Sequence, residues 1–141
     1  MSNSLYDSGR EGFLAGEIDW DGAVIKVALV RGYTFNAAHK FVSDITATGT
    51  LAATSAALSS KTVANGVADA ADITFSAVAA NGSNHSLLIF QSSAVTGGAD
   101  VASSAQRVIA WIDTATNLPA LPNGGDISVA WDNGSNKIFK L

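Results

Sequence analysis

Apolar and polar residues alternate most regularly over the last stretch of the chain, 125–141. Apolar side chains occupy every second position of 127–131, which is the period-two pattern of a half-buried β-strand. The DNGSN segment that follows is rich in residues that tolerate turn conformations. Residues 137–141 alternate again, so the pattern predicts a closing β-hairpin that packs Phe139 and Leu141 into the core.

Several earlier stretches have the same period or are apolar throughout. A continuous apolar run is typical of a central strand, and an alternating run is typical of a strand with one buried face. The Asp-Gly pair at 21–22 and the Asn-Gly pair at 65–66 are strong turn signals. The predicted strands before the closing hairpin are 12–20, 24–30, 58–63, 72–78, 86–91 and 106–113.

One stretch has a helical period instead. Asn36 is a favourable N-cap, and apolar residues recur at intervals of three and four after it. We therefore expect a single helix at about 36–45. A helix this short is not stable alone, so it should lie against the sheet through Phe41, Val42 and Ile45.

Three stretches have no clear period. Residues 46–57 are rich in Ala, Thr, Ser and Gly and fit a loop, an extended arm or a weak strand. Residues 92–105 are predicted to form a long polar loop, and 117–125 a loop containing Pro and Gly. We expect these segments to be the least tightly packed parts of the chain.

These elements predict a mainly β fold: an antiparallel β-sandwich or partly closed barrel of about seven strands, with one short helix at 36–45. No strand–helix–strand alternation is present. Residues 1–11 are polar and are expected to form an N-terminal arm, with 12–141 as a single β-sandwich domain. A chain of 141 residues fits one domain.

Composition excludes several classes of function. The chain has no cysteine, so disulfides, thiol catalysis and cysteine-bound metals are excluded. Its net charge is -4 and only 14% of its residues are charged, which argues against a nucleic-acid partner. The polar N-terminus has no secretion-signal pattern, and the longest apolar run, 23–30, is too short to span a bilayer. The sparse charge favours a homo-oligomer, a dimer or trimer, in which neighbouring subunits cover part of the surface.

Candidate catalytic residues are few. His39 and His85 are the only histidines. A Ser–His–Asp triad could be assembled from Ser43, His39 and Asp44, or from Ser86, His85 and a distant aspartate. Adjacent residues on a helix or strand point in different directions, so these sets do not form a triad. We expect His39 on the exposed side of the helix and His85 at a turn.

The acidic residues do not form a recognisable site. Asp19 and Asp21 resemble the start of a calcium loop, but the later carboxylates and the terminal Glu of that motif are missing. Asp69 and Asp72 are close enough in sequence to share a metal, although solvated turn acids are the simpler interpretation. A glycosidase pair would need Glu11 or Glu17 and an aspartate. We predict no catalytic residue, no metal site and no cofactor.

The three tryptophans have two interpretations. Trp20, Trp111 and Trp131 could form a stacking surface for a sugar or a protein partner. Each also lies in an apolar pattern, where aromatic residues are usually core anchors. We expect all three in the core.

The chain contains the motifs LYDSGREGFL (5–14), IDW (18–20), IKVALV (25–30), YTFN (33–36), HKF (39–41), WDNG (131–134) and IFKL (138–141). In these motifs it resembles a group of small tailed-bacteriophage proteins encoded among virion structural genes. The resemblance covers nearly the whole sequence, and no catalytic residue comes with it.

This resemblance implies a non-enzymatic virion structural protein. The role it favours is that of a capsid decoration, or cement, protein, which binds major capsid subunits on the particle after synthesis in the host cytoplasm. A tail, collar or fibre component that contacts the host surface is the alternative, and an enzyme is a third hypothesis. For a decoration protein we expect the contacts in 2–11, 46–57 and 92–105.

Overall fold

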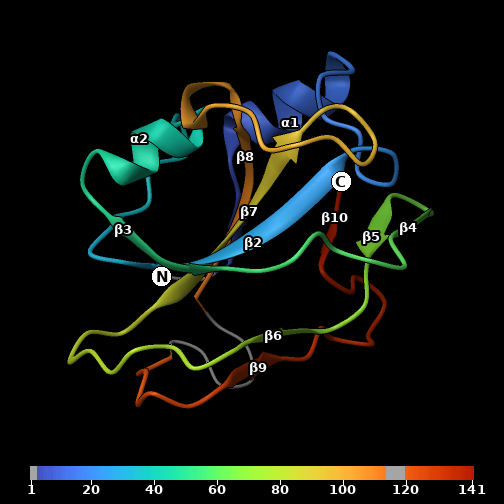
Figure 1. Cartoon of the computed structure of the whole chain (residues 1–141). Coiled ribbons are helices and arrows are strands. Elements are labelled where there is room, and N and C mark those ends of the chain that lie inside the picture. Colours follow the sequence, from blue (N-terminus) through green and yellow to red (C-terminus); the bar gives the residue numbers. More distant parts are fainter. Residues whose placement is uncertain (1–2, 114–119) are drawn as a thin grey trace.

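The computed structural model describes residues 3–113 and 120–141, and these residues form a mainly β fold built from antiparallel sheets, as predicted. The largest sheet has five strands in the order β1-β8-β7-β2-β3 (Figure 1). In the described part of the chain the sheets do not close into a barrel. The five strands are β1 (Ser4–Leu5), β8 (Arg107–Ile112), β7 (Ser86–Ser93), β2 (Val24–Arg31) and β3 (Thr50–Thr54).

Two smaller sheets cover one face of the five-stranded sheet. β6 and β9 form a ladder at the bottom of Figure 1, and β10, β5 and β4 form a second group at its right-hand side. These strands are β4 (Thr62–Ala64), β5 (Val67–Asp69), β6 (Ile73–Phe75), β9 (Ile127–Val129) and β10 (Phe139–Lys140). The helical elements are α1 (Asp7–Leu14), α2 (Val42–Thr46) and the 3-10 turn η1 (Ser103–Ala105).

The three central strands β2, β7 and β8 confirm the apolar runs predicted at 24–30, 86–91 and 106–113. Successive side chains of a strand point to opposite faces, so a strand that is apolar on both sides needs a cover on both sides. Ile25, Leu87 and Ile109 belong to a core shared with the smaller sheets. Val30 and Leu88 belong to a second core on the opposite face, shared with Val42 of α2.

The helix predicted at 36–45 is wrong in its bounds, because α2 contains only Val42–Thr46. Asp44 is the third residue of α2, and its carboxylate accepts the backbone N–H groups of Lys40 and Phe41 at 2.9 and 3.0 Å. These two bonds cap the N-terminus of the helix. Residues 33–41, here called the strap, cross the sheet in an extended and turn conformation. The strap is held by backbone bonds, one of which joins Val108 N–H to the Lys40 carbonyl at 3.1 Å.

The N-terminal residues do not form the expected polar arm. Ser4–Leu5 pairs with β8, Tyr6 is fully buried, and α1 follows at once. The strand predicted at 12–20 is also wrong, because residues 12–14 are helical and turns follow at 15–16 and 20–22. Gly9 lets α1 approach the sheet, since a Cβ at this position would lie 2.8 Å from the Ile109 carbonyl oxygen.

The predicted closing hairpin is wrong in its pairing. β9 pairs with β6, and β10 pairs with β5, so the two halves of 125–141 belong to different sheets. Trp131 separates them, because its backbone N–H donates to Asp72 and its indole N–H to the Ala71 carbonyl. Phe139 packs against the core as expected, whereas Leu141 is 56% exposed.

The remaining sequence predictions are resolved individually. The ambiguous stretch 46–57 contains the edge strand β3, and the short strand predicted at 58–63 lies at Thr62–Ala64. The turn at 65–66 is confirmed by positive φ values of 54° for Asn65 and 78° for Gly66. Of the loop predicted at 117–125, residues 117–119 lie outside the described part of the chain.

Candidate functional site

His39 lies in the strap and not on a helix. Its Nδ1 is 2.8 Å from the hydroxyl oxygen of Tyr33, which also receives the Tyr6 hydroxyl at 3.3 Å and the Asn36 backbone N–H at 3.2 Å. With two donors already directed at this oxygen, Tyr33 donates its own proton to His39. Neutral His39 therefore carries its ring proton on Nε2.

This Tyr6–Tyr33–His39 chain was not expected from the sequence. Burial, and then the hydrogen bond to Tyr33, raise the pKa of Tyr6 far above its ordinary value, so its phenol stays neutral. The rings also pack, with Tyr33 edge-on to Trp111 at 5.0 Å and Tyr6 at 4.9 Å from Phe35. The contacts fasten the strap to the sheet, and the fully buried Tyr6 has no path to a substrate.

The predicted partners of His39 have other roles. Asp44 caps α2, and its backbone bonds from Phe41 and Lys40 lower the pKa of its carboxyl, with a smaller contribution from His39. Among the described residues, no hydrogen bond joins His39 to Ser43 or Asp44. The three residues are therefore close in sequence without the geometry of a catalytic triad.

His85 is fully buried, which the prediction of a turn position missed. Its Nδ1 is 2.8 Å from the Ser83 carbonyl oxygen and donates to it, and its backbone pairs with Ala120. The Nε2 atom is buried without a hydrogen-bond partner. A buried unpaired acceptor is costly, but none of the described carboxylates approaches it to complete a proton relay.

The acidic residues singled out in the sequence are separated in the structure. Asp69 forms an ion pair of 2.9 Å with Lys137, and this contact lowers the pKa of its carboxyl. Asp72 accepts the Trp131 backbone N–H, and Asp19 accepts that of Gly22. Within 3–113 and 120–141, no group of three or more metal-ligating side chains is present.

Glu17 has a partner that no sequence pattern predicts. Its carboxylate forms an ion pair with the buried guanidinium of Arg107, which also donates to the Ser8 carbonyl oxygen. Arg107 comes from β8, 90 residues along the chain from Glu17. The contact ties α1 and the turn after it to the sheet, so its role is structural.

The three tryptophans are buried, as expected. Trp20 and Trp131 belong to the core between the layers, and Trp111 to the core beneath the strap. The indole N–H groups of Trp20 and Trp131 donate to backbone carbonyls of Asp69 and Ala71. No stacking platform for a sugar is formed by these rings.

The most open part of the fold is the edge of the five-stranded sheet at β3. β3 is the terminal strand, bonded to β2 on one side. None of the described residues forms a backbone hydrogen bond to its other side. An edge of this kind can accept an additional strand from another chain.

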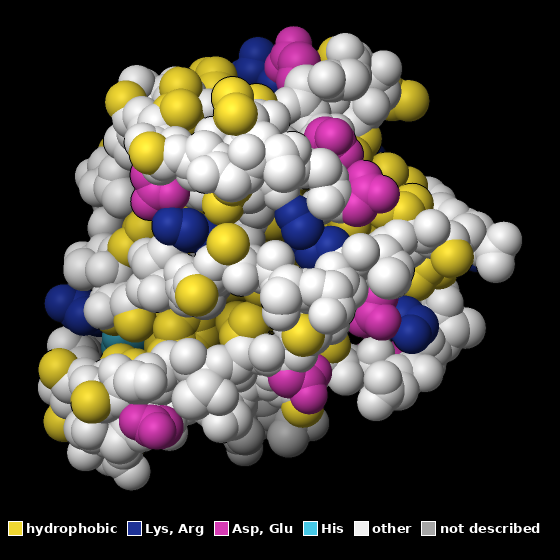
Figure 2. Space-filling model, turned by 45° about the vertical axis from the view of Figure 1, so that its right-hand side comes forward, with side chains coloured by type: hydrophobic (Ala, Val, Ile, Leu, Met, Phe, Trp, Pro, Cys, Tyr) yellow, Lys and Arg dark blue, Asp and Glu magenta, His cyan; other side chains and the backbone are white. Residues whose placement is uncertain are grey.

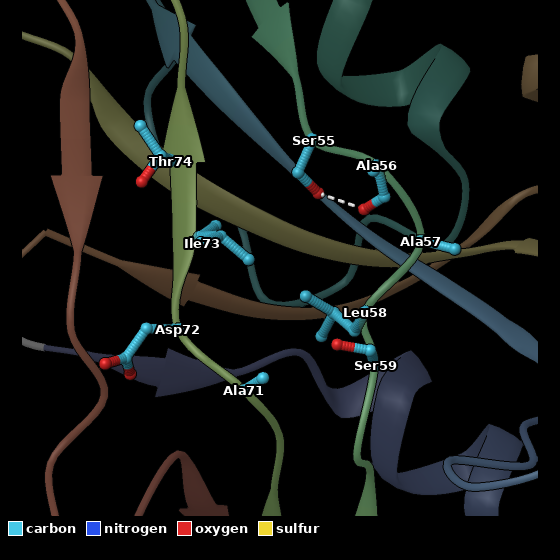
Figure 3. A pocket seen from close by; sticks show the side chains of 9 residues that line it. All are labelled: Ser55, Ala56, Ala57, Leu58, Ser59, Ala71, Asp72, Ile73 and Thr74. Carbon is cyan, nitrogen blue, oxygen red and sulfur yellow. Dashed lines mark hydrogen bonds between the residues drawn. The ribbon is translucent and has the colours of Figure 1, made fainter.

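A cleft of about 200 Å³ continues from this edge between residues 55–59 and 71–74 (Figure 3). Ile73 and Leu58 point toward each other across it, whereas Asp72 and Thr74 point away toward the opposite strand. The Ala71 N–H donates to the Ser59 carbonyl at 2.9 Å and closes one end. The cleft therefore lies between two strand edges, β3 with its continuation and β6.

Ser55 shapes the cleft wall. Its hydroxyl oxygen accepts the Val27 backbone N–H at 3.0 Å and donates to the Ala56 carbonyl at 2.7 Å (Figure 3). The Ser55 side chain takes the place of a backbone acceptor of the sheet. The strand pairing can therefore end here while the Val27 N–H keeps a hydrogen-bond partner. The neighbours are small residues, Ala56 and Ala57, which leave room for another backbone to approach.

The other predicted contact segments differ from this edge. Residues 4–11 belong to β1 and α1 and pack into the body. The loop 92–105 is tied to β2 by an ion pair of 2.9 Å between Lys26 and Asp100, and Thr96 donates to the Gly22 carbonyl. Of the three segments, 46–57 is the one that contains a strand, β3, with an unpaired edge among the described residues.

None of the described helices is both long enough and apolar enough to cross a membrane. No family model, curated protein or solved structure matches the chain.

Proposed function

We propose that this chain is a non-enzymatic virion structural protein of a tailed bacteriophage, and in particular a capsid decoration protein that binds major capsid subunits. The observation that carries the proposal is the open β3 edge above its small-residue cleft. The sequence resemblance set out above supports the assignment to a phage particle. Its site of action is then the virion, after synthesis in the host cytoplasm.

The β3 edge favours a protein partner over a small molecule. Strand addition gains affinity from main-chain hydrogen bonds, and pockets beside the edge give specificity. Here Thr50–Thr54 supplies the free backbone groups, and the gap between Leu58 and Ile73 supplies a pocket for one side chain of the added strand.

On a capsid with many identical sites, a weak contact at each site is sufficient for stable attachment of an oligomer. A five-residue edge offers few main-chain bonds, so a single copy would bind weakly. A dimer or trimer that engages several capsid subunits at once gains avidity from effective concentration. We therefore include homo-oligomerisation on the particle in the proposal.

The first experiment is to count and locate the protein in purified particles. Quantitative mass spectrometry of virions from the strain that carries the gene should give hundreds of copies, and electron cryomicroscopy should place them at a symmetry site of the capsid. A few to tens of copies would instead support the tail, collar or fibre alternative. Absence from the particle would reject the virion assignment.

The second experiment tests the edge itself. Ala52 lies in β3, and Ala80 is exposed and belongs neither to β3 nor to the cleft lining, so Ala52→Lys and Ala80→Lys form a matched pair. Lysine on an edge strand opposes strand addition. Binding to capsids stripped of this protein should fall about tenfold or more for Ala52→Lys and stay unchanged for Ala80→Lys. Equal binding by both variants would exclude the β3 edge as the contact.

A further inference from the structure

We propose that a second surface, the cleft between α1 and the β4–β5 hairpin, binds a large apolar side chain in a lysine- or arginine-rich segment of a partner protein. This α1–hairpin cleft shares no lining residue with the β3 cleft. The inference rests on its own geometry and charge, and it does not depend on the virion assignment.

The cleft has an aromatic floor. Its volume is about 270 Å³, and Phe13, Trp20 and Phe139 lie at its base, with Val63, Val67 and Leu141 also among its lining. The Phe139 ring centroid is 5.1 Å from that of Trp20 and 5.8 Å from that of Phe13. Apolar cavities of about 150 Å³ bind benzene in other proteins, so this volume accepts a leucine or phenylalanine side chain.

Apolar side chains in and next to the cleft are exposed to solvent. Val63 at the hairpin is 56% exposed, and Leu14 at the end of α1, next in sequence to the floor residue Phe13, is 90% exposed. A scattered exposed leucine needs no explanation, but exposed apolar residues beside an apolar cleft mark an interaction surface. At 90% exposure Leu14 buries almost no apolar surface in the free protein, which favours a role in contact with another molecule.

The rim of the cleft is acidic. Asp19 and Asp21 line it, and Glu11 and Glu17 lie on the same α1–turn segment, 11–21, which contains no Lys or Arg. In Figure 2, acidic and hydrophobic side chains border one another at the upper right of the molecule. All four carboxylate residues are exposed, so their field reaches a partner in solution.

Neighbouring cations only partly neutralise this rim. Desolvation lowers the pKa of Lys61, and the nearby carboxylates of Asp19 and Asp21 raise it by a smaller amount. The Lys61 ammonium also donates to the Ala23 carbonyl. Glu17 is paired with Arg107. The remaining excess of negative charge selects a cationic partner segment.

A second copy of this chain fits the cleft poorly. Two copies that met through this cleft would bring their acidic 11–21 segments together, and like charges oppose a contact at this surface. A foreign segment in which lysines or arginines flank a leucine or phenylalanine satisfies both the floor and the rim. Such a contact, on a surface distinct from β3, would let one molecule hold two partners.

The test uses two synthetic peptides that differ only in flanking charge: a Leu-Phe pair between lysines and the same pair between glutamates. Each is titrated into the ¹⁵N-labelled full chain and followed by NMR. We expect the lysine peptide to shift the Trp20 indole and the amides of Phe13 and Val63, with affinity falling as salt rises. The glutamate peptide should bind at least about tenfold more weakly.

Two matched pairs of variants identify the site. Asp21→Asn and Asp132→Asn each remove one exposed carboxylate, and Val63→Thr and Val95→Thr each change one exposed valine. Asp21→Asn should weaken the lysine peptide about two- to fivefold, and Val63→Thr about fivefold, while Asp132→Asn and Val95→Thr leave it unchanged.

Three results would overturn the proposal. The first is equal binding of both peptides, and the second is shifts scattered over the surface with equal losses in the control variants. The third is no binding of the lysine peptide at millimolar concentration. All four substitutions are at exposed positions, so folding should be preserved, and the amide spectrum of each free variant verifies it.

Discussion

The two edges of the five-stranded sheet differ in the length of the edge strand and in the elements that cover it. At one edge, β1 has two residues, and the chain turns at the buried Tyr6 into α1. α1 is then held by the close approach of Gly9 to Ile109 and by the buried guanidinium of Arg107. At the other edge, β3 has five residues and no described element beyond it.

The difference separates residues that stabilise the protein from residues that are available to a partner. An unprotected edge strand is a hazard, because it can pair with any exposed strand. This chain shortens one edge to two residues and leaves the other long, with a side-chain cleft beside it. The proposed function assigns the β3 edge to a partner, and the following predictions test the contrast between the two edges in order of expected effect.

The largest effect is expected at the anchor beside the open edge. Trp131→Ala removes a buried indole whose N–H donates to the Ala71 carbonyl at 3.0 Å, next to the β3 cleft. The free energy of unfolding should fall by about 3–5 kcal/mol in a urea titration. Leu121→Ala, at a 61% exposed leucine, should change it by less than about 0.5 kcal/mol. A negligible effect of Trp131→Ala would mean that this segment does not pack as described.

The close approach at the β1 edge predicts the next largest effect. Gly9→Ala places a Cβ 2.8 Å from the Ile109 carbonyl oxygen, where only backbone can move. Overpacking of this kind costs about 1–3 kcal/mol, although alanine recovers up to about 1 kcal/mol through helix propensity. The control is Gly82→Ala, because a Cβ there meets nothing within 4 Å. If both variants unfold at the same urea concentration, α1 does not pack tightly on β8.

A pH-dependent effect is expected at the helix that leads into β3. Bonds from the Phe41 and Lys40 N–H groups lower the pKa of Asp44 in the folded state. A carboxyl with a lowered pKa stabilises the fold above its unfolded pKa, and this contribution is lost as pH falls through the folded value. Asp44→Ala should therefore cost about 1 kcal/mol at pH 7, and the difference from the unchanged protein should shrink below about pH 4.

The control on that prediction is an acid outside any cap. Asp21 is exposed and forms no hydrogen bond among those described, so Asp21→Ala should have a smaller effect at pH 7. Urea unfolding of both variants from pH 3 to pH 7 measures the difference. A constant cost of Asp44→Ala over this range would show that the carboxylate charge does not contribute to the cap.

The smallest effect on stability is expected at the open edge. Ala52→Lys changes a partly buried small side chain on the edge strand β3, where a lysine can extend into solvent, so the free energy of unfolding of the free protein should change by about 0.5 kcal/mol or less. The same variant is expected to lose particle binding, as set out above. A large loss of stability would mean that the edge is part of the packed body, and the contrast with β1 would fail.

Sequence patterns predicted those strands whose residues are compatible with only one environment, the buried interior of the sheet. The apolar runs at 24–30, 86–91 and 106–113 cannot be solvated on either face, so they had to become central strands. The tryptophans were placed in the core for the same reason. The short strands were harder, because a run of two or three residues has no period of its own to read.

The candidate sites were harder to predict. No local pattern identified the Glu17–Arg107 pair, the Tyr6–Tyr33–His39 chain or the β3 cleft, because each joins segments far apart in the sequence. The α1–hairpin cleft had a partial signal, since 11–21 combines four acids with exposed apolar residues. Without the fold, that segment was interpreted as the end of an arm followed by a strand.

The sequence by itself determined a mainly β architecture, its central strands and its turn at 65–66, because burial and glycine-compatible backbone are properties of local residues. Tertiary structure decided which strands pair, where α1 and α2 begin, and which edge remains open. Pairing depends on contacts between distant segments, and the free energy of those contacts exceeds local preference. The clearest case is 125–141, whose alternation correctly indicated two strands and whose partners were decided by β5 and β6.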